Sequence, residues 1–495
     1  MDAYTALEAQ FGRMSKLDDA LEILHWDMAA MMPSGGAFGR GETMATLRVL
    51  RHELATDARL ADLLSEAGGA DLGDWQQANL REMRRLHAHA TAVPGRLVEA
   101  LSRAGSACEM TWRASRKAND FATLEPKLTE VMGLVREVAA AKAEALGVEP
   151  YEAMLDQHEP GGKTARIDAL FDDLAANLPG LIERVLDHQA GQPPVAATGG
   201  PFPIEAQRAL GVKLMQTLGF EFDHGRLDVS HHPFCGGSAD DVRITTRYDE
   251  ADFTKALMGV IHETGHALYE RGRPKAWRYQ PVGLARGMSV HESQSLLMEM
   301  QACRSREFLD YVAPLLRDAF AGDGPAWAVD NLHRLYTQVR RGLIRVDADE
   351  VTYPAHVVLR YRLERALLAG DLDVRDLPGA WREGMVALVG IEPSDDKDGC
   401  MQDIHWMDGT VGYFPTYTLG AMTAAQLFEA ATEAVPEVLP SIAKGEFGPL
   451  LGWLRANVHS WGSYYSTDEL LTRATGRPLD ASVFRAHLER RYLGA

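Results

Sequence analysis

The sequence lacks several features that define common classes of protein. Its 495 residues include only four cysteines, Cys108, Cys235, Cys303 and Cys400, which are too scattered for a zinc ribbon or a disulfide framework. No run of about 18 apolar residues is present, and the N-terminus lacks the basic segment and apolar stretch of a secretory signal. We therefore expect a soluble, cytoplasmic protein without a membrane partner.

Positive charge is also scarce. The chain has 51 lysines and arginines against 70 aspartates and glutamates, which gives a formal net charge of -19. Because such a surface repels polyanions, nucleic acid is not an expected partner. The hydrophobic content of 46% is that of an ordinary globular protein, so material for a large core is present.

The most informative feature of the chain is the pentapeptide HETGH at residues 262–266. On a helix, side chains four residues apart share one face, so both imidazoles can bind one metal ion while Glu263 points at its open position. This arrangement is typical of a zinc hydrolase. The alternative is that two surface histidines flank an exposed glutamate.

The residues around the pentapeptide predict the helix that this interpretation needs. Apolar residues recur at three- and four-residue spacing across 253–268. Asp249 or Asp252 can cap the start of the helix, and Gly272 followed by Pro274 marks its end.

A catalytic zinc ion takes three protein ligands and a water, so two histidines require a third group from elsewhere. Glu292 lies 26 residues beyond His266, which is far enough for a second helix to lie alongside the first. However, Ser289-x-x-Glu292 also matches a capping box, in which the glutamate accepts a backbone N–H, and the residues alone leave both interpretations open. Glu270 and Glu299 are weaker candidates because each lies at the far end of its helix.

A second polar cluster follows at residues 402–417, where aromatic residues alternate with glycine and proline. This composition is typical of a loop that lines a cleft. His405 and a tyrosine of this stretch can donate hydrogen bonds to a developing oxyanion. The alternative for His405 is a packed, hydrogen-bonded side chain beside Trp406.

Arg345 is a candidate for recognising a substrate carboxylate, because guanidinium binds carboxylate in a bidentate manner. The alternative, which the local sequence favours, is an ordinary ion pair with Asp347 or Asp349. Asp241 and Arg243 lie two apart on one strand face and are interpreted as a structural pair.

The predicted organisation is mainly α with a minor β element. The helical period dominates residues 1–190 and returns after residue 250, with an exposed connection at 191–203. Alternation within 226–230 and 241–246 predicts a small sheet next to the metal-binding helix.

Six motifs, taken in order, resemble those of the carboxypeptidase Taq family of zinc metallocarboxypeptidases. The match runs from residues 32–36 to Tyr417 and beyond. The sequence departs from the family at Leu296, Met298 and Met300, where an arginine, an aromatic residue and an asparagine are usual. The six motifs are His232-Pro233-Phe234, Asp241-x-Arg243-x-Thr245, His262 to His266, His291-Glu292-Ser293-Gln294, Ile344-Arg345-x-x-Ala348-Asp349 and Gly399-x-x-Gln402-Asp403-x-His405-Trp406.

The resemblance implies one zincin-like metallopeptidase domain over residues 1–495, almost entirely helical, with a deep central groove. Residues 1–190 would form a helical part that covers the groove, and residues 204–495 the catalytic part with the metal site. The family usually forms homodimers and removes single residues from free peptide C-termini with broad preference. Zinc is the implied metal, and cobalt or manganese suit the same ligands.

The resemblance also assigns roles to individual residues. It implies that Glu292 is the third ligand and that Glu263 is the general base, which passes a proton from water to the leaving amine. Two other functions stay as alternatives: an endo-acting zinc oligopeptidase and a catalytically silent helical peptide-binding protein. The implied roles are metal binding by His262, His266 and Glu292, recognition of the substrate carboxylate by Arg345 and Tyr417, and oxyanion donation by His405.

Overall fold

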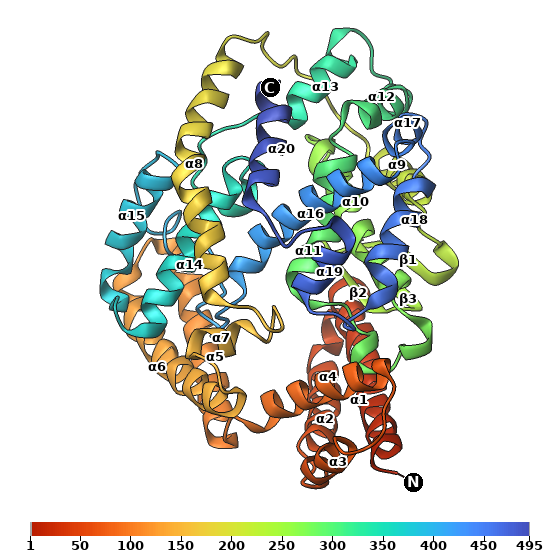
Figure 1. Ribbon diagram of the computed structural model, residues 1–495. Coiled ribbons are helices and arrows are strands. Elements are labelled where there is room, and N and C mark those ends of the chain that lie inside the picture. Colours follow the sequence, from red (N-terminus) through yellow and green to blue (C-terminus); the bar gives the residue numbers. More distant parts are fainter. Residues whose placement is uncertain (1, 495) are drawn as a thin grey trace. The chain divides into compact units, whose positions relative to one another are not determined.

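The computed structural model describes residues 2–494 and is mainly helical, with one three-stranded sheet (Figure 1). This confirms the predicted fold class of mainly α with a small β element. The chain forms two compact units, each assembled from three separate stretches. Within the described residues, no helix combines the length and the apolar character needed to cross a membrane. The first unit comprises Met1–Ala90, Pro194–Tyr336 and Thr423–Leu479, and the second comprises Thr91–Pro193, Thr337–Met422 and Asp480–Ala495.

The first unit contains the sheet and the helix that carries the HETGH pentapeptide (Figure 1). Its helices are α1 (Ala3–Ala30), α2 (Ala37–Ala55), α3 (Arg59–Ala67), α4 (Asp74–Thr91), α9 (Ile204–Leu218), α10 (Phe253–Gly272), α11 (Gly287–Leu296), α12 (Arg306–Phe320), α13 (Val329–Tyr336), α17 (Val438–Ile442), α18 (Gly448–Asn457) and α19 (Thr467–Thr475).

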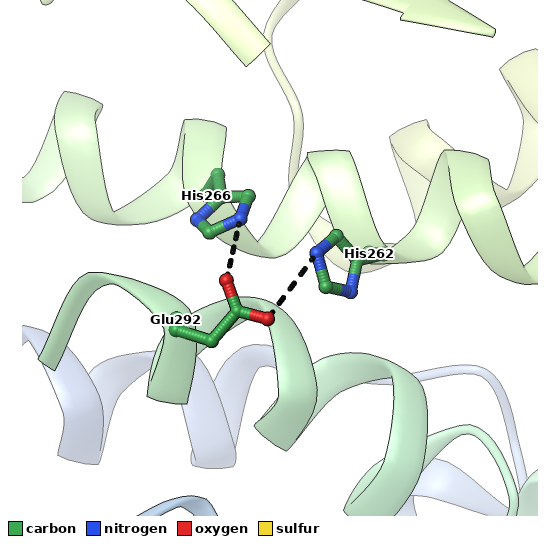
Figure 2. A group of neighbouring side chains, drawn as sticks. All are labelled: His262, His266 and Glu292. Atoms are coloured by element: carbon green, nitrogen blue, oxygen red, sulfur yellow. Dashed lines mark ion pairs between the residues drawn. The ribbon is translucent and has the colours of Figure 1, made fainter. Parts of the chain in front are cut away.

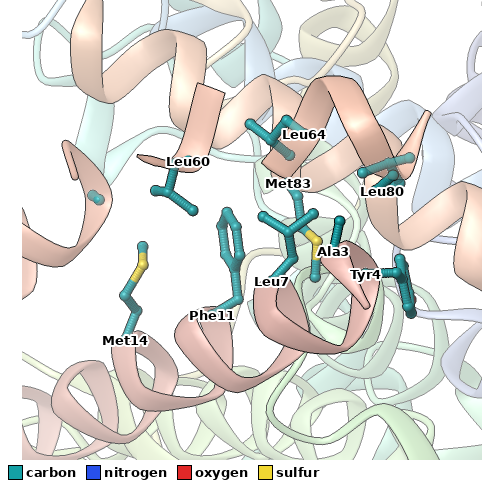
Figure 3. Close-up of a cluster of buried hydrophobic side chains, with 11 residues drawn as sticks. Ala3, Tyr4, Leu7, Phe11, Met14, Leu60, Leu64, Leu80 and Met83 are labelled. Atoms are coloured by element: carbon teal, nitrogen blue, oxygen red, sulfur yellow. The ribbon is translucent and has the colours of Figure 1, made fainter. Parts of the chain in front are cut away.

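An apolar core joins the first four helices of this unit (Figure 3). Leu7, Phe11 and Met14 of α1 lie at three- and four-residue spacing, so they share one face of the helix. They pack against residues of α3 and α4 that include Leu60 and Met83. Because burying one such side chain contributes about 1.5–3 kcal/mol, this core anchors α1 to its neighbours.

The sheet has the order β1-β3-β2. β1 (Gly225–Val229) is parallel to β3 (Asp241–Thr246), and β2 (Phe234–Ser238) is antiparallel to it. β1 and β3 match the two predicted strands closely, whereas β2 was not predicted.

The two faces of β3 show how the sheet is held next to α10. Val242 and Ile244 are buried in a core that includes Val260 of α10. On the opposite face, Arg243 stacks on the ring of Trp26 from α1, with the guanidinium 4.2 Å from the ring centroid. Alternation along the strand therefore places the sheet against α10 and leaves its polar face to α1.

The second unit is built almost entirely of helices. Glu364, a fully buried residue of α14 (Tyr353–Ala369), accepts hydrogen bonds from Tyr151, Trp406 and the backbone N–H of Gly412 and so ties these segments together. Helix α16 (Phe414–Ala434) continues from this unit into the first. The other helices are α5 (Gly95–Ala118), α6 (Phe121–Leu146), α7 (Pro150–Leu155), α8 (Thr164–Ala190), α14 (Tyr353–Ala369), α15 (Leu377–Leu388) and α20 (Ala481–Leu493).

Candidate active site

Helix α10 has the boundaries that the sequence predicts. The carboxylate of Asp252 accepts the backbone N–H of Thr254 at 2.9 Å, so Asp252 rather than Asp249 is the N-cap. His262 and His266 lie one turn apart, with ring centroids separated by 5.0 Å. The predicted helix, and the shared face of the two histidines, are therefore confirmed.

Glu292 lies inside α11 and not at its start. The helix begins at Gly287, with Arg286 as the N-cap and no side-chain cap. Because Ser289 is already within the helix, the capping-box interpretation of Ser289 and Glu292 is wrong. The helix continues into a π-helical turn, η5 (Leu297–Ala302).

His262, His266 and Glu292 face one another across these two helices (Figure 2). The Oε1 atom of Glu292 lies 4.0 Å from Nε2 of His262, and its Oε2 lies 3.7 Å from Nε2 of His266. Zinc bonds of about 2.0–2.2 Å in tetrahedral geometry separate ligand atoms by roughly 3.3–3.6 Å. The ligand atoms of the three side chains all lie within 4.8 Å of one another, slightly further apart than around a bound ion, so they could hold one metal ion after a small inward movement. Three ligands leave the fourth position open, as in catalytic sites.

Gly265 allows α10 and α11 to approach closely enough for this arrangement. A Cβ atom at this position would lie 2.5 Å from the carbonyl oxygen of Gln294 and 2.6 Å from Cα of Ser295. Both are backbone atoms that cannot move alone. The glycine in the middle of the pentapeptide therefore sets the separation of the two helices.

Burial and neighbouring charges shift the titration of the pentapeptide side chains. Burial raises the pKa of Glu263 to about 7, with a smaller opposing contribution from His262 and a further increase from Glu292. Burial also opposes the charged form of His262, but Glu299, Glu292 and Glu263 together raise its pKa to about 10. The surroundings are therefore strongly negative and favour a cation.

Two further carboxylates pair with histidines at this site, and neither belongs to the three-residue group. Glu299 lies 3.0 Å from Nδ1 of His262, on the side of the ring away from Glu292. Glu270 lies 2.9 Å from Nε2 of His291, whose ring stacks on His266 at 4.5 Å. From the sequence, both glutamates were expected only as weaker candidates for metal ligands.

Arg345 is buried in the second unit, in the short 3₁₀ turn η7 (Arg345–Asp347). Its Nη2 donates to Asp403 at 2.8 Å and its Nη1 donates to the hydroxyl of Tyr353 at 3.0 Å. The expected local ion pair with Asp347 or Asp349 is therefore wrong. The actual partner lies 58 positions along the chain.

Asp403 is shared by two arginines. Nε of Arg360, a fully buried residue of α14, donates to its second oxygen at 2.6 Å. Burial opposes ionisation of Asp403, but Arg360 and Arg345 hold its pKa well below the usual range. One carboxylate facing two guanidinium groups leaves an excess of one positive charge. Arg360 was not predicted from the sequence, because it stands among the buried residues of a helix.

Tyr417 and His405 lie near this pair. The guanidinium of Arg345 stacks over the ring of Tyr417, 4.9 Å from its centroid. The ring of His405 packs on Phe414 at 4.4 Å, and its Nδ1 is buried without a hydrogen-bond partner within residues 2–494. Burial lowers the pKa of His405 to about 4, so its imidazole is neutral at pH 7.

The structure thus places the predicted residues in two clusters. His262, His266 and Glu292 meet in the first unit, next to Glu263, and Arg345, His405 and Tyr417 meet in the second.

Comparison with known proteins gives matches over nearly the whole chain. Residues 6–492 match the family model described as carboxypeptidase Taq (M32) metallopeptidase. Thermostable carboxypeptidase 1 of Thermus thermophilus is 40% identical over 479 residues, which is 94% of each chain. The protein of the same name from Pyrococcus furiosus is 33% identical over 492 residues, covering 98% of this chain and 97% of the relative.

Solved structures agree with these matches. Metallocarboxypeptidase 1 of Trypanosoma cruzi superposes with a TM-score of 0.97 at 43% identity and covers 99% of each chain. The M32 carboxypeptidase of Deinococcus radiodurans gives a TM-score of 0.93 at 35% identity, covering 99% of this chain and 98% of that one. The chain therefore belongs to the carboxypeptidase Taq (M32) family of metallopeptidases and is a metallocarboxypeptidase.

Proposed function

We propose that the protein is a zinc-dependent carboxypeptidase that releases single amino acids from the free C-terminus of peptides, with broad preference for the residue released. The observation that carries the proposal is the meeting of His262, His266 and Glu292 around one point, with Glu263 beside them on α10. When bound by these three side chains, zinc supplies a Lewis acid that activates water and polarises a carbonyl.

Glu263 is the general base in this proposal. A carboxylate whose pKa is raised to about 7 by burial can both accept and release a proton near neutral pH. It takes a proton from the attacking water and delivers it to the amine of the departing amino acid. Its place between the two histidines keeps it near both reacting groups.

Arg345 and Tyr417 bind the C-terminal carboxylate of the peptide. The excess positive charge that Arg345 and Arg360 leave around Asp403 supports this assignment, because a buried charge favours an ion of opposite sign. An amidated peptide leaves that charge without a partner, which costs a few kcal/mol and rejects the substrate. His405, neutral at pH 7, donates an N–H to the oxyanion.

The proposal is tested with an unblocked peptide and its C-terminally amidated twin, whose products are followed by mass. The expected result is stepwise loss of single C-terminal residues from the free acid only, and no loss with the Glu263→Gln variant. Internal cleavage of both peptides would instead indicate an endo-acting oligopeptidase. No cleavage with zinc, cobalt or manganese would favour the silent peptide-binding alternative.

The identity of the metal and the assembly are tested separately. Elemental analysis of protein purified without added metal is expected to find zinc, and cobalt or manganese are expected to restore activity after chelation. The homodimer is expected at about twice the mass of the 54.4 kDa chain in light scattering.

A further inference from the structure

Two histidine–carboxylate pairs connect α10 with α11 and the π-helical turn. In one, Glu299 lies 3.0 Å from Nδ1 of His262, and in the other, Glu270 lies 2.9 Å from Nε2 of His291. The pairs are alike in chemistry, but only His262 belongs to the three-residue group. The two pairs therefore have the same kind of partner and nearly the same distance. They differ in whether the histidine is one of the three residues that would bind the metal.

We propose that Glu299 is a positioning residue for the metal, which acts through His262. By accepting the Nδ1–H of His262, its carboxylate fixes the ring orientation and leaves Nε2 facing Glu292 and His266 as the ligand atom. The inference rests on the proposed metal site, and it adds a residue that neither binds the ion nor touches the substrate.

The reach of Glu299 follows from its place in the chain. It lies seven residues beyond Glu292, in the π-helical turn that continues α11. The contacts of His291 with Glu270 and of Glu299 with His262 show that α10 and α11 run in opposite directions. Glu299 consequently meets the outer edge of His262 and not the metal position.

A second charge holds Glu299 in place. Nη2 of Arg304 donates to its Oε1 at 2.5 Å, while Oε2 faces His262. Each carboxylate oxygen therefore has its own partner, which fixes the orientation of the group. The turn that carries Glu299 is π-helical, and such turns occur frequently at functional sites.

His266 provides an internal contrast. Its ring stacks on His291, and no carboxylate pairs with its Nδ1 among the residues that the structure describes. Loss of Glu299 is therefore expected to affect one ligand and leave the other in place, so binding weakens without being abolished.

The experiment measures the zinc dissociation constant of the full-length protein by competition with a chelator. Glu299→Gln is expected to raise this constant about 10- to 100-fold, the usual effect of removing such a partner. Glu270→Gln, the matched control, is expected to change it less than about threefold. In cobalt-loaded protein, the visible absorption should change with Glu299→Gln and stay constant with Glu270→Gln.

A second variant covers the case in which Glu299→Gln fails to fold because the ion pair between Arg304 and Glu299 is lost. The double variant Glu299→Gln/Arg304→Gln removes both charges together and is expected to show the same weakened zinc binding. Thermal unfolding of the metal-free proteins shows which variants are folded, because a folded variant gives a cooperative transition. An unchanged zinc constant in a folded Glu299 variant, or an equal loss in the Glu270 control, would overturn the inference.

These outcomes are separate from those of the proposed function. Zinc bound tightly by a protein that cleaves no peptide would contradict the proposed activity and leave the role of Glu299 intact. An active enzyme whose zinc affinity does not depend on Glu299 would contradict this inference alone.

Discussion

The two units each contain a buried charged cluster, and the two clusters have opposite excess charge. Around the HETGH helix, four carboxylates face two guanidinium groups, whereas around Arg345 two guanidinium groups share one carboxylate. Burying net charge costs free energy unless a partner compensates it. The first cluster is therefore suited to a cation and the second to an anion. The groups of the first cluster are Glu263, Glu270, Glu292, Glu299, Arg273 and Arg304, and those of the second are Arg345, Arg360 and Asp403.

The clusters also differ in how the chain builds them. The first is carried mainly by α10 and by α11 with its π-helical turn, two packed segments in contact at Gly265. The second joins a 3₁₀ turn, an irregular loop and α14. In the first cluster, regular helices fix the spacing of the metal ligands. The second cluster depends on ion pairs between residues far apart in the sequence for its shape.

The largest effect is expected from Glu263→Gln, which tests the chemical role of the first cluster. Because a general base contributes about 10²–10⁴-fold, kcat is expected to fall about 1,000-fold. The amide preserves the shape of the side chain, so zinc content should stay at one ion per chain. Activity within tenfold of the wild type would remove Glu263 from the mechanism.

Glu270 tests whether carboxylates of the first cluster are ionised. Burial opposes the charged form, but Arg273 and His291 lower the pKa of Glu270 from 4.5 to about 2. A lowered pKa contributes stability above pH 4.5, here about 3 kcal/mol, and this contribution declines as pH falls toward 2.

Chemical denaturation of the wild type and Glu270→Gln should therefore show a difference of about 3 kcal/mol at pH 7 that narrows below about pH 4.5. A difference that stays constant down to pH 3.5 would mean that the charge of Glu270 does not stabilise the fold.

Gly265→Ala tests the close packing of α10 and α11. The new methyl group would meet backbone atoms at 2.5–2.6 Å, so the helices must separate, at a cost of about 1–3 kcal/mol. Zinc binding should weaken because the histidines move away from Glu292. A methyl group at Gly259 on the same helix meets no atom within 4 Å, so Gly259→Ala should leave zinc binding unchanged and raise stability by about 0.5–1 kcal/mol. If the two variants have the same stability and the same zinc affinity, the close approach of α10 and α11 at Gly265 is not what holds the metal ligands in place.

Arg360→Gln tests the charge excess of the second cluster. Without Arg360, Asp403 neutralises Arg345, and KM for free-acid peptides is expected to rise about tenfold, equivalent to about 1.4 kcal/mol. The control is Arg362→Gln, which changes an exposed arginine two residues away. If KM is the same in both variants, Arg360 does not contribute to the positive charge that binds the substrate carboxylate.

The helix that carries the two histidines of the first cluster was predictable because its information is local. The period of apolar residues and the cap at Asp252 predicted α10, and the metal motif lies within it. The second strand was missed because Phe234–Ser238 contains Cys-Gly-Gly in place of alternating side chains. The spacing of apolar residues predicts helices and strands with alternating side chains. It does not predict a strand such as β2, which is defined by its backbone pairing with β3.

The pairings that complete both clusters were not predictable from spacing. The partner of Arg345 lies 58 residues away and that of His262 lies 37 residues away, so neither follows from a local period. The nearby Asp347 and Asp349 made a local ion pair the more plausible interpretation, but the fold brings Asp403 closer. Resemblance to the family supplied the roles of these segments, and the structure supplied the partners.

The most direct test of the opposite charge excesses compares kcat/KM for a free-acid peptide and its amide in zinc-loaded wild type, Arg345→Gln and the exposed control Arg340→Gln. The account predicts a preference for the free acid of at least about 100-fold in the wild type and the control. In Arg345→Gln, the ratio of kcat/KM for the free acid to that for the amide should fall to nearly one, because activity on the free acid is lost. An undiminished preference in Arg345→Gln would contradict the assignment of the second cluster to the substrate carboxylate.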